Sequence, residues 1–176
     1  MIIKNILGIL LFVALPCFSI AQDAVITNTN MQIYASLNGK PVAWATNMVE
    51  LRINKATGEF MMQLFIDNIR LALSNPDYTP TGENLGKFLT LRGVLPIYDV
   101  LERSSNVMDL KVDLIASFNN IDYHTNFSFS ILQLNPNNNK GFSVMTKGSV
   151  SIAGLGVTGL QGFDDELGIA LSFNGF

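Results

Sequence analysis

The sequence predicts an all-β protein, an antiparallel up-and-down β-barrel of about eight strands. Three observations lead to this prediction: apolar and polar residues alternate with a period of two, turn-forming residues recur at regular intervals, and no long stretch has helical periodicity. Alternate side chains of a β-strand point to opposite faces, so this period gives each strand one dry and one wet side. Consecutive hairpins favour a meander in which each strand pairs with the next.

The clearest alternation extends from Val107 to Leu134. Its two halves are separated by a short break that contains Asn119, Asn120 and Asp122, residue types that favour tight turns. We therefore expect an antiparallel hairpin. Its apolar face comprises Met108, Leu110, Val112 and Leu114 in the first strand and Tyr123, Thr125, Phe127, Phe129 and Ile131 in the second.

The N-terminal third of the barrel is expected to consist of three strands. A strand around Met31–Ala35 is followed by the turn dipeptide Asn38-Gly39 and by one long strand from about Val42 to Ile53. After a turn at Lys55–Gly58, the strand Glu59–Leu71 returns. One face of this strand carries Phe60, Met62, Leu64 and Ile66.

The remaining segments are less regular. Residues 74–86 are expected to form a long loop, whose length suggests a lid, and Phe88–Arg92 is expected to be a short strand. Residues 93–103 fit either an extended connection or, from Ile97, one or two helical turns. Strands are expected again at Phe142–Ile152 and around Ile169–Phe173, separated by glycines that suggest bulges or tight bends.

The N-terminus has the pattern of a secretory signal peptide. Lys4 precedes an apolar run from Ile6 to Leu15, and Ser19-Ile20-Ala21 resembles a cleavage site. We therefore expect a signal peptide at residues 1–21, one barrel domain at 22–176, and a secreted or periplasmic location. The single cysteine, Cys17, would be removed, leaving no disulfide or thiol chemistry.

Composition argues against several classes of function. The 11 basic residues include Lys4, so the cleaved chain would carry 10 against 14 acidic residues, a net charge of −4. An acidic chain with scattered lysines and arginines is a poor nucleic-acid binder. No stretch after the N-terminus has the length of a transmembrane helix, and the sequence does not specify an oligomeric state.

No residue pattern predicts an enzyme, a metal site or a cofactor. His124 is the only histidine and is expected on the polar face of its strand. No catalytic triad order or nucleophile elbow is present. The acidic cluster Asp164-Asp165-Glu166 lacks the alternating spacing of a calcium loop and is interpreted as an exposed turn. Tyr34 and Trp44 are expected at one end of the barrel, where their polar edges can meet water.

Three segments resemble the YceI-like family of secreted and periplasmic β-barrel proteins. They are Lys55–Phe60, the pair Leu91-Arg92 with Tyr98-Asp99-Val100, and Gly148–Gly154, which follow the order and spacing of that family. The resemblance implies a lipocalin-like barrel that holds an isoprenoid or similar long lipid chain, without enzymatic activity.

The apolar faces can either fill a core or line a lipid cavity. On the second interpretation the ligand-binding residues are Phe60, Met62, Leu64, Ile66, Met108, Leu110, Val112, Leu114, Phe127, Phe129 and Ile131. Two alternatives remain open: a secreted interaction module of sandwich or barrel form with a filled core, and a small outer-membrane β-barrel.

Overall fold

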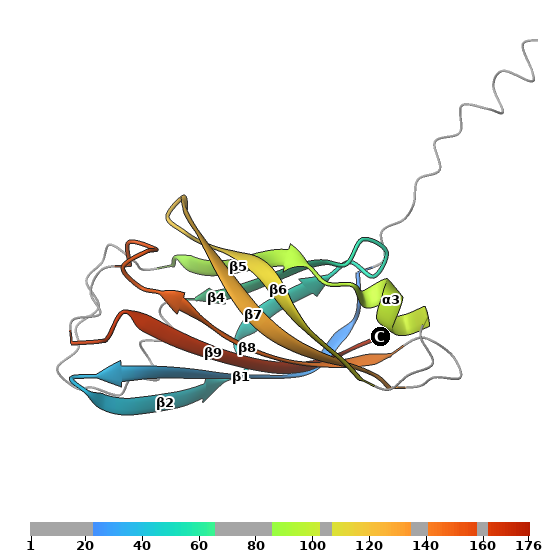
Figure 1. Ribbon diagram of the computed structural model, residues 1–176, viewed down its shortest axis with the longest axis horizontal. Coiled ribbons are helices and arrows are strands. Elements are labelled where there is room, and N and C mark those ends of the chain that lie inside the picture. Colours follow the sequence, from blue (N-terminus) through green and yellow to red (C-terminus); the bar gives the residue numbers. More distant parts are fainter. Residues whose placement is uncertain (1–22, 66–85, 103–106, 135–140, 158–161) are drawn as a thin grey trace, which may run out of the picture.

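The fold is one sheet of nine antiparallel strands, curled into a half-barrel with the lipocalin-like barrel fold (Figure 1). The computed structural model describes residues 23–65, 86–102, 107–134, 141–157 and 162–176, with the side chain of Trp44 left aside. The described elements are β1 Ile26–Leu37, β2 Lys40–Thr46, β3 Val49–Ile53, β4 Glu59–Phe65, β5 Phe88–Val94, α3 Ile97–Glu102, β6 Val107–Phe118, β7 Ile121–Gln133, β8 Phe142–Ser151 and β9 Glu166–Gly175.

The strand order explains how the sheet curls. Neighbouring strands follow the order β2-β1-β9-β8-β7-β6-β5-β4-β3, so the meander from β3 to β9 continues into β1 and β2. The strands β2 and β3 are the two edges of this ladder. The residues before β1 reach the β3 edge, because Ala24 N donates to Ile53 O at 2.8 Å and Asp23 forms an isolated bridge with Asn54.

Asparagine and glycine fix two of the hairpins. Asn38 and Gly39 have φ angles of 51° and 74°, and Asn119 and Asn120 have φ angles of 50° and 65°. Two consecutive positive φ angles are the requirement of the type I′ turn, whose twist matches that of the flanking strands. The predicted turns at both places are confirmed, as is the long hairpin of β6 and β7, which pairs Val107 with Leu132 and Phe118 with Ile121.

The expected single strand from Val42 to Ile53 is wrong. The chain leaves β2 after Thr46, whose Oγ1 accepts a hydrogen bond from Met48 N at 3.0 Å, and starts β3 at Val49. A Thr side chain that bonds backbone two residues on favours a turn over a continued strand. This break separates β2 and β3 to opposite edges of the sheet and raises the strand number from about eight to nine.

A short helix follows β5. Of the two possibilities for residues 93–103, the helical one is found in α3, which begins at Ile97. Ile97 and Val100, three residues apart, face the core and are buried. Gln133 Nε2 of β7 donates to Leu101 O at 3.1 Å, which ties the helix to the last residue of that strand.

Inward-facing side chains of the strands form one core. The members at least 99% buried that carry large side chains include Met31, Ile33, Ile53, Met62, Leu64, Leu89, Phe118, Phe142 and Phe173. The outward face of the central strands is polar, with the burial pattern alternating along β6, β7 and β9 as the sequence predicts.

Candidate functional site

Ten of the eleven predicted ligand-binding residues lie on one inward-facing apolar surface. Eight of them are buried and come from β4, β6 and β7: Phe60, Met62, Leu64, Val112, Leu114, Phe127, Phe129 and Ile131. Met108 and Leu110 are partly buried and pack against the same core. Ile66 lies outside the described residues. The alternation in the sequence therefore predicted which side chains turn inward.

Two aromatic rings meet across the interior. The ring centroids of Phe60 in β4 and Phe129 in β7 are 5.8 Å apart at an interplanar angle of 85°, an edge-to-face contact. The strands β5 and β6 separate β4 from β7 in the sheet, so this contact spans the curl rather than joining neighbours. The interior is filled with side chains at this level.

The wall of the half-barrel is incomplete between β5 and β6. These strands pair at three positions, Thr90 with Ser117, Leu91 with Ala116 and Arg92 with Ile115. Residues 107–114 of β6 pair with β7 alone among the described strands. Figure 1 shows β6 running obliquely to β5, with α3 beyond the end of β5. The ladder thus ends where β5 leaves the sheet.

A cavity of about 850 Å³ lies at this place, and we call it the lateral opening. Its apolar walls are Phe60 and Met61 of β4, Gly93 and Val94 of β5, Pro96, and Leu110, Val112 and Ile115 of β6. Phe60, Leu110 and Val112 also belong to the inward-facing apolar surface. The lateral opening therefore lies on the outside of the protein and borders the edge of the core.

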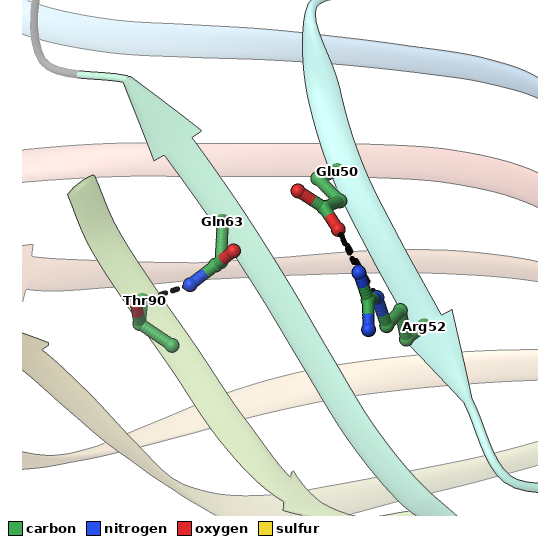
Figure 2. A network of polar contacts seen from close by, with 4 residues as sticks. All are labelled: Glu50, Arg52, Gln63 and Thr90. Atoms are coloured by element: carbon green, nitrogen blue, oxygen red, sulfur yellow. Dashed lines mark hydrogen bonds and ion pairs between the residues drawn. The ribbon is translucent and has the colours of Figure 1, made fainter. Parts of the chain in front are cut away.

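Charged side chains surround the lateral opening. Its described lining includes three cationic residues and three anionic ones: Arg52, Arg92, Lys111, Asp23, Glu59 and Asp113. Both arginines are paired. Arg52 Nε donates to Glu50 Oε1 at 3.0 Å, as Figure 2 shows beside the Gln63–Thr90 hydrogen bond. Lys111 forms no ion pair with the residues that the structure describes. Because the numbers of cationic and anionic residues are equal, the rim is polar but carries no net positive or negative charge.

A polar cluster holds β5 against the β6–β7 hairpin at the end of their short ladder. Arg92 Nη2 lies 2.7 Å from Asp122 Oδ2, and Ser117 Oγ donates to Asp122 Oδ1 at 2.5 Å. The hydrogen bond from Ser117, together with the charge of Arg92, lowers the pKa of the Asp122 carboxyl from its usual range. Sequence analysis did not predict this cluster, because Arg92 is 30 residues from Asp122 and the two side chains meet only through the register of the strands.

A second hollow lies on the outward face of the sheet. A groove of about 720 Å³ crosses β1, β6, β7, β8 and β9, and one of about 630 Å³ adjoins it. The two share Lys111, Ser128, Lys147 and Ala170. Ser128 and Ala170 have short side chains on this face, and the longer side chains around them form the walls of the groove. The groove could have been predicted from short residues at outward positions of neighbouring strands only if the register of those strands had been known.

The other polar residues considered in the sequence, His124 and the acidic cluster around Asp165, lie on the surface or form hydrogen bonds within the fold. His124 is exposed on the outward face, as expected. Asp165 accepts hydrogen bonds from Ala153 N at 2.7 Å and from Ser151 Oγ at 2.8 Å, and these lower the pKa of its carboxyl. The described residues contain no group of three or more His, Cys, Asp or Glu placed to hold a metal ion.

Other sequence-based expectations fall partly outside the described chain. Tyr34 is exposed on the outward face, whereas the side chain of Trp44 is not described. The proposed signal peptide and residues 74–85 of the predicted loop also lie outside the described residues. Among the helices of the described part, none is long and apolar enough to cross a membrane.

Comparison with known proteins supports the fold. No family model matches the sequence, and no curated protein matches it. A solved structure, that of a polyisoprenoid binding domain from Saccharophagus degradans implicated in plant cell wall breakdown, is similar with a TM-score of 0.64. The match covers 88% of this chain and 97% of that one at 8% sequence identity. At this identity the likeness establishes a shared fold.

Proposed function

We propose that this protein binds an amphipathic lipid with a long apolar chain, of the isoprenoid class, without catalysing a reaction. The observation that carries the proposal is the lateral opening, whose walls include Phe60, Leu110 and Val112 from the edge of the apolar core. The apolar chain would enter between β5 and β6, and the headgroup would stay among the charged residues of the rim. The fold shared with a polyisoprenoid binding domain supports this assignment.

The energetic basis is the burial of apolar surface. Each Å² of apolar area removed from water contributes about 25 cal/mol before the costs of ordering the ligand. Since Phe60 and Phe129 fill the interior at their level, the chain can pass them only if one ring turns aside. The binding site is thus expected to form around the ligand. The signal-peptide pattern supports a secreted or periplasmic location for this binding.

Native mass spectrometry of the protein purified from its own host, followed by lipid extraction, tests the proposal. We expect a bound mass of several hundred daltons that is released on denaturation and extracts into organic solvent. An apo mass that stays unchanged after incubation with isoprenoid and fatty-acid mixtures would contradict it.

The Phe60–Phe129 contact favours a second candidate, an interaction module with a filled core. In that case the interior serves stability alone and the surface meets a partner protein. The same mass spectrum separates the two candidates, because a filled core takes up no lipid from either mixture.

A further inference from the structure

Five exposed apolar side chains gather at the α3 end of the sheet, on its outward face. Their exposed fractions range from 38% for Leu132 to 66% for Val25. We call them the end patch; its members are Val25, Val107, Leu132, Leu134 and Phe176.

Strand register places these side chains together. Val107 of β6 is paired with Leu132 of β7, and Leu134 follows on the same face. Val25 and Phe176 exchange two backbone hydrogen bonds, of 3.0 and 3.1 Å. Gly141 lies between Leu134 and Phe176: a Cβ atom there would be 3.5 Å from Leu134 Cβ and 3.2 Å from the Phe176 ring. The absence of a side chain at Gly141 therefore lets its two apolar neighbours come together.

The end patch is apolar, whereas most other outward positions of β6 and β7 are polar. Farther from this end, outward positions of β6 and β7 hold Asp109, Lys111, Ser128 and Ser130, which suit water. Apolar residues at outward positions contribute nothing to the core, and contiguous exposed apolar patches often mark sites of interaction.

The end patch also adjoins the lateral opening along the chain. Val25 is two residues from Asp23, and Val107 is three residues from Leu110, and both Asp23 and Leu110 line the opening. A surface seated on the end patch would therefore lie beside the place where we expect a lipid chain to enter.

The chemistry of the end patch favours one kind of partner. Five partly exposed side chains offer an area on the order of a few hundred Å², below the about 800 Å² per partner of a stable protein complex. The end patch contains no Trp, Tyr or Arg, the residues that anchor most protein interfaces. Among the described residues, the charged ones nearest in sequence to Val25 and Val107 are Asp23 and Asp109, which are acidic and unsuited to an anionic surface.

We propose that the end patch seats this protein on the surface of a zwitterionic lipid bilayer. The proposal rests on the proposed lipid-binding function, for which it supplies the route of lipid exchange: the lateral opening is brought against the membrane from which a chain is taken. Seating needs apolar side chains that can enter the interface without matching a partner's shape, which is what the end patch offers.

The test uses a fluorophore as a local reporter. In a Cys17→Ser background, Leu134→Cys and Ile121→Cys carry the same environment-sensitive nitrobenzoxadiazole label. The two native side chains are matched in exposure, 41% and 42%, but Ile121 is the first residue of β7, beside the turn at the other end of β6 and β7. With phosphatidylcholine vesicles we expect a blue shift of the emission at position 134 and none at position 121.

A second substitution tests the end patch itself. Adding Phe176→Glu to the labelled Leu134→Cys protein should raise the vesicle concentration for half-maximal shift at least tenfold. Ile121→Glu, at a similarly exposed apolar position beside the turn at the other end of β6 and β7, should leave it unchanged.

Three results would overturn the proposal: no shift at position 134, equal shifts at both positions, or a shift that grows with protein concentration without vesicles. The last would identify a second copy of the chain as the partner. Lipid content, measured separately by mass spectrometry, tells this failure from failure of the lipid-binding function. A protein that carries lipid but shows no shift at position 134 binds lipid without this surface.

Discussion

Phe60 belongs both to the buried core and to the wall of the lateral opening. Its side chain is 3% exposed and packs on Phe129 in the core, yet it is also a wall of the lateral opening. Removal of the ring would join the opening to the interior. Under the proposed function, the ring that stabilises the core would therefore stand in the path of an entering lipid chain.

Phe60→Ala should lower stability and increase lipid uptake. Truncation of a buried Phe costs about 3–5 kcal/mol, because packing is lost and a cavity remains. That cavity would lie at the inner end of the lateral opening, so an isoprenoid probe should load faster and tighter than in the unsubstituted protein. Chemical denaturation and fluorescence of a labelled isoprenoid measure the two effects.

Phe118→Ala is the matched control for this prediction. Phe118 is equally buried, but it lies at the end of β6 next to the turn and does not line the lateral opening. It should lose similar stability without a gain in loading. Equal gains in both variants would mean that loosening of the core, rather than access through the opening, controls uptake.

At the scale of elements, the junction of β5 with β6 determines the lateral opening. Three paired positions and the Arg92–Asp122–Ser117 cluster hold these strands together at one end. The hydrogen bond from Ser117 and the charge of Arg92 keep the pKa of the Asp122 carboxyl low. A group with a lowered pKa in the folded state stabilises that state above its ordinary pKa and loses this effect as the pH falls.

Acidification should therefore loosen the β5–β6 junction. As the pH falls below the ordinary aspartate pKa of about 3.9, Asp122 becomes protonated and its ion pair with Arg92 is lost. We expect amide hydrogen exchange in β5, corrected for the intrinsic pH dependence, to become faster over this range. The effect should be small, since the group is exposed to solvent.

Asp122→Asn isolates the contribution of the carboxylate. The variant should show faster corrected exchange in β5 at neutral pH and no further change on acidification. Asp165→Asn is the control, because Asp165 also has a lowered pKa but bonds Ser151 and Ala153 rather than a residue of β5. If the acid effect in β5 persisted in Asp122→Asn, another group would be responsible.

The sequence predicts elements where a local pattern determines them. The alternation in β6 and β7 fixed which side chains face inward, and Asn38-Gly39 fixed a turn, because both signals act between close neighbours. The break between β2 and β3 was missed, since it depends on the bond from Met48 N to Thr46 Oγ1 within an otherwise apolar stretch. Contacts such as Phe60 with Phe129 were beyond reach, because they depend on the curl of the whole sheet.

At the scale of the whole molecule, the incomplete ladder between β5 and β6 would allow the proposed lipid to enter an interior that is filled with side chains. A closed barrel would have to open hydrogen-bonded strands to admit a chain. Here residues 107–114 of β6 have no described strand partner on the β5 side, so the wall can widen without loss of ladder bonds. Bound lipid would then replace the contacts that the core side chains give up.

This mechanism predicts that lipid binding raises the thermal stability of the protein. A ligand that binds only the folded state, at 100 times its Kd, adds about 2.7 kcal/mol. For a domain of this size, such a gain raises Tm by about 5–10 °C. Leu110→Glu should abolish the rise, because it places a charge on an apolar wall of the lateral opening, whereas Met145→Glu on the outward face should retain it. Differential scanning calorimetry with and without a soluble isoprenol decides the matter: an equal rise in both variants would mean that the ligand binds elsewhere.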